Sequence, residues 1–252
     1  MILNLLDEAV KLLREGLKII DRLVDPKEKT TKLRLVADGF ESLGLREEAR
    51  EVLLEAARTA LTIEDTEDMV GEIRNISREL IYCGYPEDAL QVLLDAIKNI
   101  DRMEDVEARL YAYTQIVEEL IDLKAVENAR ELTYQMIELI SALEDIEIID
   151  PDTLIDAFKQ AAMFINGNEL KELFSKVLYK VDEVEDDEIH DDLLLDLVDI
   201  ALKLGWIDEA KNIVLNMMRS YSSRISGILK FSEFAVSRFE KVSHTVYEYE
   251  EE

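Results

Sequence analysis

Apolar and polar positions alternate along this chain with the period of an α-helix, and the pattern itself recurs. The stretch SLGLREEAREVLLEAA, residues 42–57, has a glycine followed by apolar residues three and four positions apart. Near-copies recur as IYCGYPEDALQVLLDAI, IDLKAVENARELTYQMI and LKLGWIDEAKNIVLNMM. This spacing places the apolar side chains on one face of a helix. The pattern therefore predicts a series of similar amphipathic helices.

The near-copies share a period of 40 residues, with one single-residue insertion. The marker position of the repeat, which is the alanine in REEA, is occupied in turn by Ala9, Ala49, Ala89, Ala129, Leu170 and Ala210. The position three residues after the marker is apolar in every copy, and the position five before it is Gly44, Gly84, Lys124 and Gly205. Several positions in register over five periods indicate a true internal repeat.

Each period predicts two helices, which we name A and B in chain order. The B helix carries the marker, and the A helix before it has its own apolar face, as in Leu33, Ala37 and Phe40. Asp25-Pro26 and Asp150-Pro151 stand where A helices should begin, as a capping residue and a first-turn proline. The glycine between A and B predicts a tight reversal into an antiparallel hairpin. Such a hairpin buries its apolar faces only by stacking on the next, which predicts an all-α solenoid of stacked antiparallel helix pairs.

The turn-and-marker strings LGLREEA, CGYPEDA and LGWIDEA resemble the second-helix turn of the tetratricopeptide repeat (TPR) family. Ala37 and Ser77 match the small residues of that family's first helix, and Phe40 matches its aromatic residue. The TPR period is 34, the family's tryptophan and closing proline are missing, and HEAT-like stacking is the competing description. We expect one TPR-like solenoid over residues 1–244. Its parts are a half-repeat at 3–24, repeats at about 26–63, 66–103, 105–143, 151–184 and 187–221, a closing helix at about 222–243, and an acidic tail at 245–252.

The charge excludes some partners. The chain has 57 acidic and 29 basic residues, a formal net charge of −28, and a field of that sign repels nucleic-acid phosphates and anionic membranes. We therefore expect no nucleic-acid and no membrane partner. The start of the chain lacks the features of a secretory signal or of a membrane span, so we expect a soluble, cytoplasmic protein.

Candidate chemistry is sparse, and we expect neither catalysis nor a cofactor or bound metal. The acidic run DEVEDDEIHDD, residues 182–192, lacks the spacing of a calcium loop and coincides with a turn between repeats. We interpret it as a solvated turn with acids in the first turn of the next helix. His190 and His244 are far apart in the repeat order, and Cys83 beside Gly84 is typical of a packing residue rather than a reactive thiol.

The remaining candidate surface is the concave face that A helices form in TPR-like solenoids. The resemblance implies that a peptide segment binds there, against Arg34, Arg74, Arg78, Tyr82, Tyr111 and Thr114. Arginines stacked in one column can hold the carboxylates of an acidic segment by paired hydrogen bonds. The alternative is that they form internal ion pairs with acids on neighbouring helices.

Two functions from different classes stay open, with a metal-dependent or hydrolytic enzyme as the weaker third. The first is a protein-interaction scaffold that binds a partner segment on the concave face. The second is a structural or regulatory protein that self-associates through the N-terminal half-repeat or the closing helix. Residues 211–244 carry six basic and two acidic residues, so this end is basic whereas the rest is acidic. We expect Ile225, Ile228 and Leu229 to face the core, and Phe231 and Phe234 either to contact a partner or to pack on the last B helix.

Overall fold

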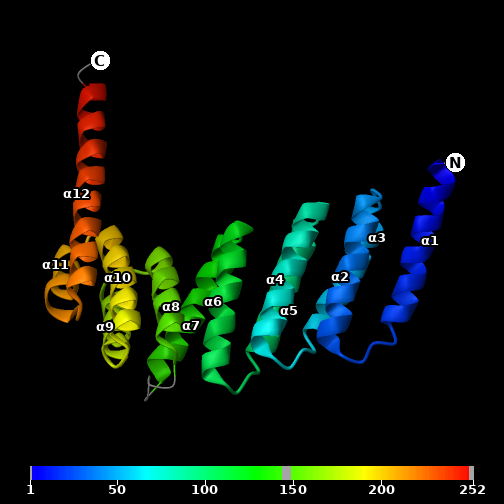
Figure 1. The fold of residues 1–252 in the computed structure, drawn as a ribbon, viewed down its shortest axis with the longest axis horizontal. Helices are drawn as coiled ribbons and strands as arrows, with labels where there is room; N and C mark the ends of the chain where they lie inside the picture. The colour runs from blue at the N-terminus through cyan, green and yellow to red at the C-terminus, as the bar shows by residue number, and fades with distance from the viewer. Residues whose placement is uncertain (1, 144–148, 250–252) are drawn as a thin grey trace. The chain divides into compact units, whose positions relative to one another are not determined.

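The computed structural model describes residues 2–143 and 149–249, and the chain divides into two compact units, residues 1–139 and 140–252. The described residues form helices in the order that Figure 1 shows. The helices that begin before the division are α1 (Ile2–Ile20), α2 (Pro26–Ser42), α3 (Arg46–Ala60), α4 (Thr66–Cys83), α5 (Pro86–Ile100), α6 (Val106–Asp122) and α7 (Val126–Ala142), of which α7 crosses it. Those of unit 2 are α8 (Pro151–Phe164), α9 (Asn168–Asp182), α10 (Asp187–Leu204), α11 (Ile207–Asn212), the π-helical turn η1 (Ile213–Met217) and α12 (Tyr221–Tyr249).

Successive helices pack as A–B pairs within each unit. In unit 1, α2 packs on α3 and α4 on α5, and the A helices α2, α4 and α6 also contact one another in sequence. In unit 2, α8 packs on α9, and the A-type helices α8, α10 and α12 form the corresponding row. The predicted fold class, an all-α TPR-like solenoid of stacked antiparallel pairs, is confirmed within the units. The single domain over residues 1–244 and its repeat boundaries stay a prediction.

The marker columns form the core, as the periodicity predicts. Ala49, Ala89, Ala129, Leu170 and Ala210 are buried, and so is the position three residues later in each of these repeats. The small side chains at Ala56 and Ala96 are also buried, which lets neighbouring helices approach closely. In unit 2 the rings of Phe158 and Phe174 are buried, and the half-buried Trp206 lies edge-on to Phe174 at a centroid distance of 5.3 Å.

An aspartate caps the start of every A helix from α2 to α10. The carboxylates of Asp25, Asp65, Asp105, Asp150 and Asp186 accept hydrogen bonds from backbone N–H groups of the first turn. Capping satisfies donors that have no partner within the helix. The acidic positions between repeats therefore mark where each of these A helices begins.

The reversals between A and B helices use left-handed backbone, as the glycine column predicts. Gly84 has a φ of 97° and Gly205 a φ of 77°, and the equivalent Lys124 has a φ of 60°. A side chain in this conformation costs about 1 kcal/mol or more. Lys124 is therefore a strained position in an otherwise favourable turn.

The last pair departs from the repeat. The B helix α11 passes into the π-helical turn η1, and Met218 has an extended backbone before α12 begins. After this change, α12 packs on the core with a different face from the one that the repeat predicts, and Gly227 is buried against Val214. The prediction that Ile225, Ile228 and Leu229 face the core is wrong, because all three are exposed. Phe231 and Phe234 are half-buried instead, which agrees with the packing alternative.

Candidate functional site

The A-helix face of unit 1 carries the predicted arginines, and each is bonded to acids on the next A helix. The guanidinium of Arg34 on α2 donates to Glu72 at 2.8 Å and to Glu79 at 2.5 Å, both on α4. Arg74 on α4 donates to Glu119 at 2.8 Å and Glu118 at 3.2 Å, both on α6. Arg34 and Arg74 therefore each bind a glutamate that lies 45 residues further along the chain.

Glu119 is the centre of this network. Only 2% of its side chain is exposed, and it accepts from both Arg74 and Arg78, with the shorter Arg78 contact at 2.6 Å. A buried carboxylate requires such partners because an uncompensated charge away from water is costly. In this structure the internal ion pairs form, and Arg34 and Arg74 serve the stacking of α2, α4 and α6.

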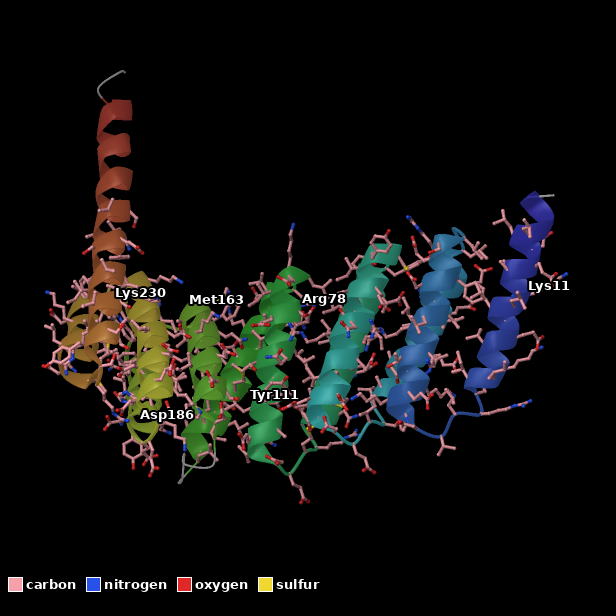
Figure 2. The ribbon with its side chains drawn as sticks, viewed as in Figure 1. Lys11, Arg78, Tyr111, Met163, Asp186 and Lys230 are labelled. Atoms are coloured by element: carbon pink, nitrogen blue, oxygen red, sulfur yellow. The ribbon has the colours of Figure 1, made fainter. Side chains whose placement is uncertain are left out.

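The other predicted residues on this face differ in exposure. Tyr82 is 73% exposed and the side chain of Arg78 54%, and Figure 2 marks Arg78 and Tyr111 on the A-helix row of unit 1. Tyr111 is half-buried, and burial raises the pKa of its hydroxyl. Thr114 is buried, with its hydroxyl bonded to the carbonyl of Tyr111 at 2.7 Å. A role for these residues in partner binding stays a prediction.

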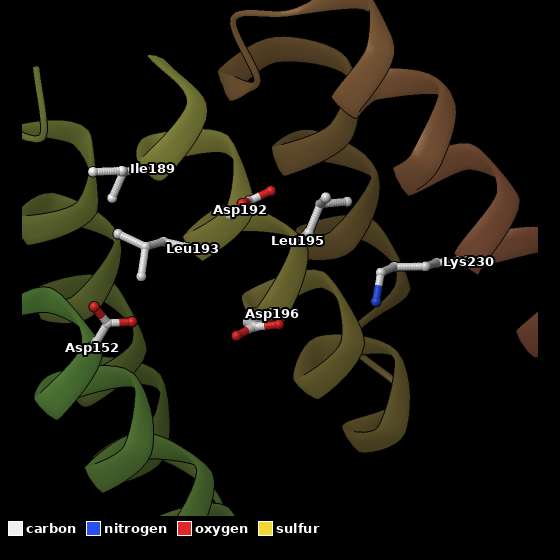
Figure 3. Close-up of a pocket in the computed structure, with 7 residues that line it drawn as sticks. All are labelled: Asp152, Ile189, Asp192, Leu193, Leu195, Asp196 and Lys230. Atoms are coloured by element: carbon white, nitrogen blue, oxygen red, sulfur yellow. The ribbon is translucent and has the colours of Figure 1, made fainter. Parts of the chain in front are cut away.

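The A-helix row of unit 2 holds an open groove of about 500 Å³. We name it the acidic groove, and Figure 3 shows its lining side chains from α8, α10 and α12. They are Asp152, Ile189, Asp192, Leu193, Leu195, Asp196 and Lys230. Ile189 and the half-buried Leu195 give an apolar surface, and the aspartates place carboxylates along it.

The charges of the acidic groove are not balanced within it. Burial and repulsion from Asp150 and Asp196 raise the pKa of the Asp152 carboxyl. The only basic residue in the lining, Lys230, is bonded to Asp199 on α10. Among the described residues, neither Asp192 nor Asp196 forms an ion pair, so the groove keeps a net negative field that a cation would relieve.

The register of the repeat links this groove to the predicted surface. Asp152 and Asp192 occupy the same column as Tyr111, and Leu195 occupies the column of Arg74 and Thr114. When these two columns are followed past the single-residue insertion in the repeat, they lead to residues that line the groove. The prediction stopped at Thr114 because arginine and tyrosine are the more conspicuous binding residues.

A second polar cluster in unit 2 is buried, and sequence reasoning missed it. Asp191 is fully buried and accepts from the backbone N–H groups of Arg219 at 2.8 Å and Ser220 at 2.7 Å. His190 lies beside it, with Nδ1 3.0 Å from a carboxylate oxygen. Burial alone would raise the pKa of Asp191, but the bonds from Arg219, Ser220, His190 and Ser223 lower it overall.

This cluster is structural, because it fixes where α12 begins. The carboxylate of Asp191 satisfies N–H groups just before that helix. The Arg219 guanidinium donates to the carbonyls of Asp182, the last residue of α9, and of Val184 and Glu185 in the turn that follows. The acidic run at residues 182–192 therefore combines an exposed turn, as predicted, with a buried anchor at its end.

The described residues offer little for catalysis. No group of three or more histidine, cysteine or acidic side chains in residues 2–143 and 149–249 is arranged to hold a metal ion. Cys83 is buried, and burial raises the pKa of its thiol. His244 lies outside the residues whose side chains the structure describes. None of the helices in the described part is long and apolar enough to cross a membrane.

No protein-family model and no curated protein sequence matches this chain. Among solved structures, it is similar to the nearly identical TPR-like repeats assigned to a kinesin light chain from Podosopora anserina, with a TM-score of 0.48 and 15% identity, covering 83% of this chain and 99% of the other. It is also similar to BtubC (BKLC) from P. vanneervenii, with a TM-score of 0.44, 10% identity and 92% of each chain covered. A third similar structure is Ton1535 from Thermococcus onnurineus NA1, with a TM-score of 0.32, 12% identity, 87% of this chain and 83% of the other. These likenesses are of low identity and concern the arrangement of helices.

Proposed function

We propose that this protein is an interaction scaffold that binds a basic segment of a partner protein in the acidic groove of unit 2. The observation that carries the proposal is the groove itself, an open groove in which Asp152, Asp192 and Asp196 lie beside Ile189 and Leu195. Grooves between helices are common sites for peptide segments. The proposal assigns the chain no catalytic role.

The charges decide between acidic and basic partners. On the A-helix face of unit 1, the cationic groups of Arg34 and Arg74 are already bonded to carboxylates. The acidic groove instead has an excess of negative charge, and burial together with repulsion from Asp150 and Asp196 raises the pKa of Asp152. A lysine or arginine of a partner relieves that repulsion. The net charge of −28 also steers basic partners toward the molecule.

The shape of the groove adds a second requirement. Ile189 is more than half exposed, and Leu193 and Leu195 line the groove beside it. Covering Ile189 and the half-buried Leu195 removes apolar surface from water, at about 25 cal/mol per Å², whereas Leu193 is already buried. The partner segment should therefore carry apolar residues between its basic ones, so that cations meet the aspartates while apolar side chains cover Ile189 and Leu195.

The test compares two charge reversals of equal size in unit 2. Asp196→Lys changes the groove, and Glu172→Lys changes an exposed acid on the B helix α9. The probe is a short labelled peptide that alternates lysine and leucine, and its affinity is measured by fluorescence polarisation. We expect Asp196→Lys to weaken binding at least about tenfold, and Glu172→Lys to change it little.

Two outcomes would contradict the proposal. If both variants weaken binding equally, the peptide responds to net charge and not to the groove. If a matched peptide with glutamate in place of lysine binds as tightly as the lysine peptide, the charge argument is wrong. Binding of the lysine peptide should also weaken as salt is raised, because exposed charges are screened.

A further inference from the structure

Helix α1 exposes a stripe of apolar side chains at positions that the other repeats bury. Leu12 stands three residues after the marker and is 65% exposed, whereas the same position is at most 5% exposed in each of the five later repeats. Leu5 and Ile19, seven residues to either side of Leu12, are 67% and 66% exposed. Ala9 and Gly16 lie between them, so the five residues follow one face of the helix at alternating intervals of four and three. We name this face the α1 stripe.

The corresponding face of the B helix α5 is covered by the helix pair before it. Tyr85 and Asn99 occupy the two outer positions of the stripe in this repeat. The Tyr85 hydroxyl donates to Glu47 on α3 at 2.8 Å. The Asn99 amide donates at 2.8 Å to the carbonyl of Leu61, directly after the end of α3. Because α5 also packs along the A helix α4, the α1 stripe is the kind of face that this fold packs against a preceding B helix and the A helix that follows it.

Unit 2 has an uncovered groove between a B helix and the A-type helix that follows it. The groove lies between α12 and the segment formed by α11 and η1, it has a volume of about 310 Å³, and we name it the α12 groove. Its lining includes Lys211, Val214 and Leu215 from α11 and η1, and Ile228, Phe231 and Ala235 from α12. Leu215 is 58% exposed and Ile228 49%. A helix in this groove would pack on η1 and α12 as α5 packs on α3 and α4.

A recurring ion pair marks the register in which one B helix follows another. It joins the residue after the marker of one repeat to the residue before the marker of the next. In unit 1, Arg50 on α3 donates to Asp88 on α5 at 3.1 Å. In unit 2, Lys171 on α9 lies 3.6 Å from Glu209 on α11. The same cation-to-carboxylate contact therefore accompanies the stacking of B helices in both units.

The α12 groove and α1 carry the two complementary members of this ion pair. Lys211 is the residue after a marker and lines the α12 groove, and Glu8 is the residue before a marker and is exposed on α1. Within the chain, Lys211 lies 3.8 Å from Asp208 and Glu8 3.6 Å from Lys11, both exposed contacts within one helix that contribute little. The register and the charges thus identify α1 of a second copy as the helix that fits the α12 groove.

We propose that copies of this protein associate head to tail, with α1 of one copy packed in the α12 groove of the next. The α1 stripe then covers Leu215 and Ile228, and Glu8 pairs with Lys211. The contact joins two different surfaces, so it builds closed rings or open chains of copies rather than a two-fold dimer. The proposal does not depend on the function of the acidic groove. Each added copy brings another acidic groove, so a partner with several basic segments would gain avidity.

The first experiment measures mass in solution by light scattering at increasing protein concentration. We expect the unaltered protein to associate, and Leu12→Glu and Leu215→Glu each to be monomeric with an unchanged melting temperature, because both side chains are exposed within the chain. An equal mixture of the two variants should form a dimer with one chain of each, since one variant keeps the α12 groove and the other keeps the α1 stripe. Leu35→Glu is the matched control, because Leu35 is a similarly exposed leucine on α2, and it should associate like the unaltered protein.

Three results would overturn the proposal. The first is an unaltered protein that stays monomeric at every concentration. The second is association of Leu12→Glu or of Leu215→Glu alone, because the contact would then not need both surfaces. The third is a mixture of the two variants that stays monomeric, because the two intact surfaces would then not recognise each other.

The second experiment exchanges the charges of the proposed ion pair. Glu8→Lys and Lys211→Glu should each weaken association about threefold or more, because like charges then face each other across the contact. The chain with both changes has the original net charge and an oppositely oriented ion pair at every contact, so its association should recover to within about twofold of the unaltered protein. If the two effects simply add in the double variant, Glu8 and Lys211 do not meet and the proposed register is wrong.

Discussion

Replacing Arg74 by methionine tests whether the arginine column of unit 1 is a binding surface or part of the fold. Methionine keeps most of the apolar length of the side chain and removes the charge and the donors. The change breaks the 2.8 Å hydrogen bond to Glu119, the 3.2 Å bond to Glu118 and the contact to Gln115. An arginine that is free on the surface is replaceable at a cost within about 0.5 kcal/mol.

The expected cost follows from the burial of Glu119. Removing one partner of a buried ion pair costs about 3–5 kcal/mol. Because Glu119 keeps its bonds to Arg78, which is more exposed, we expect the lower end, about 3 kcal/mol. At about 2–4 °C per kcal/mol for a chain of this size, the melting temperature should fall by roughly 6–12 °C.

Thermal unfolding followed by circular dichroism measures this fall, with Arg58→Met as the control. Arg58 is exposed near the end of α3 and forms no ion pair with the other described residues. The control should change the melting temperature by no more than about a degree or two. Equal melting temperatures for the two variants would refute the reasoning, and the arginine column would then be available to a partner.

Two further predictions concern stability. Asp191→Asn should cost about 2 kcal/mol at neutral pH, whereas the exposed Asp192→Asn should cost little. Because the fold lowers the pKa of Asp191, the stabilisation is complete above the unfolded pKa near 4 and is lost as the pH falls through the folded pKa. Urea titrations should show that the difference in free energy of unfolding between Asp191→Asn and the unaltered protein disappears below about pH 4. A difference that does not change with pH would exclude the ionised carboxylate as its cause. Lys124→Gly should stabilise the protein by about 1 kcal/mol, because glycine adopts the left-handed backbone without strain, and a loss of stability in the same titration would show that Lys124 makes a compensating contact.

The core and the helix boundaries could be predicted because they depend on local rules. Burial of the marker at Ala49 and Ala89 follows from periodicity, and the reversals at Gly84 and Gly205 follow from the freedom of glycine at positive φ. Aspartate caps at Asp25 and Asp150 were readable from the proline that follows each. Each of these features involves residues within one or two helical turns of one another.

The features that the sequence did not predict depend on contacts between helices. Whether Arg74 meets a partner or Glu119 is decided by how far α4 and α6 are offset along their axes, which no periodicity reports. The buried role of Asp191 depends on the N–H groups of Arg219 and Ser220, about 30 residues away. The orientation of α12 was mispredicted because the π-helical turn and the extended Met218 break the phase of the repeat.

The acidic groove is the central claim, and mapping a bound peptide by NMR tests it most directly. Amide resonances of the labelled protein are followed while the lysine–leucine peptide is added. The account predicts shifts concentrated in α8, α10 and the first half of α12, around Asp152, Asp192 and Lys230. Shifts concentrated on α2, α4 and α6 around Arg78 and Tyr82 would contradict it and place the binding surface on the A-helix face of unit 1.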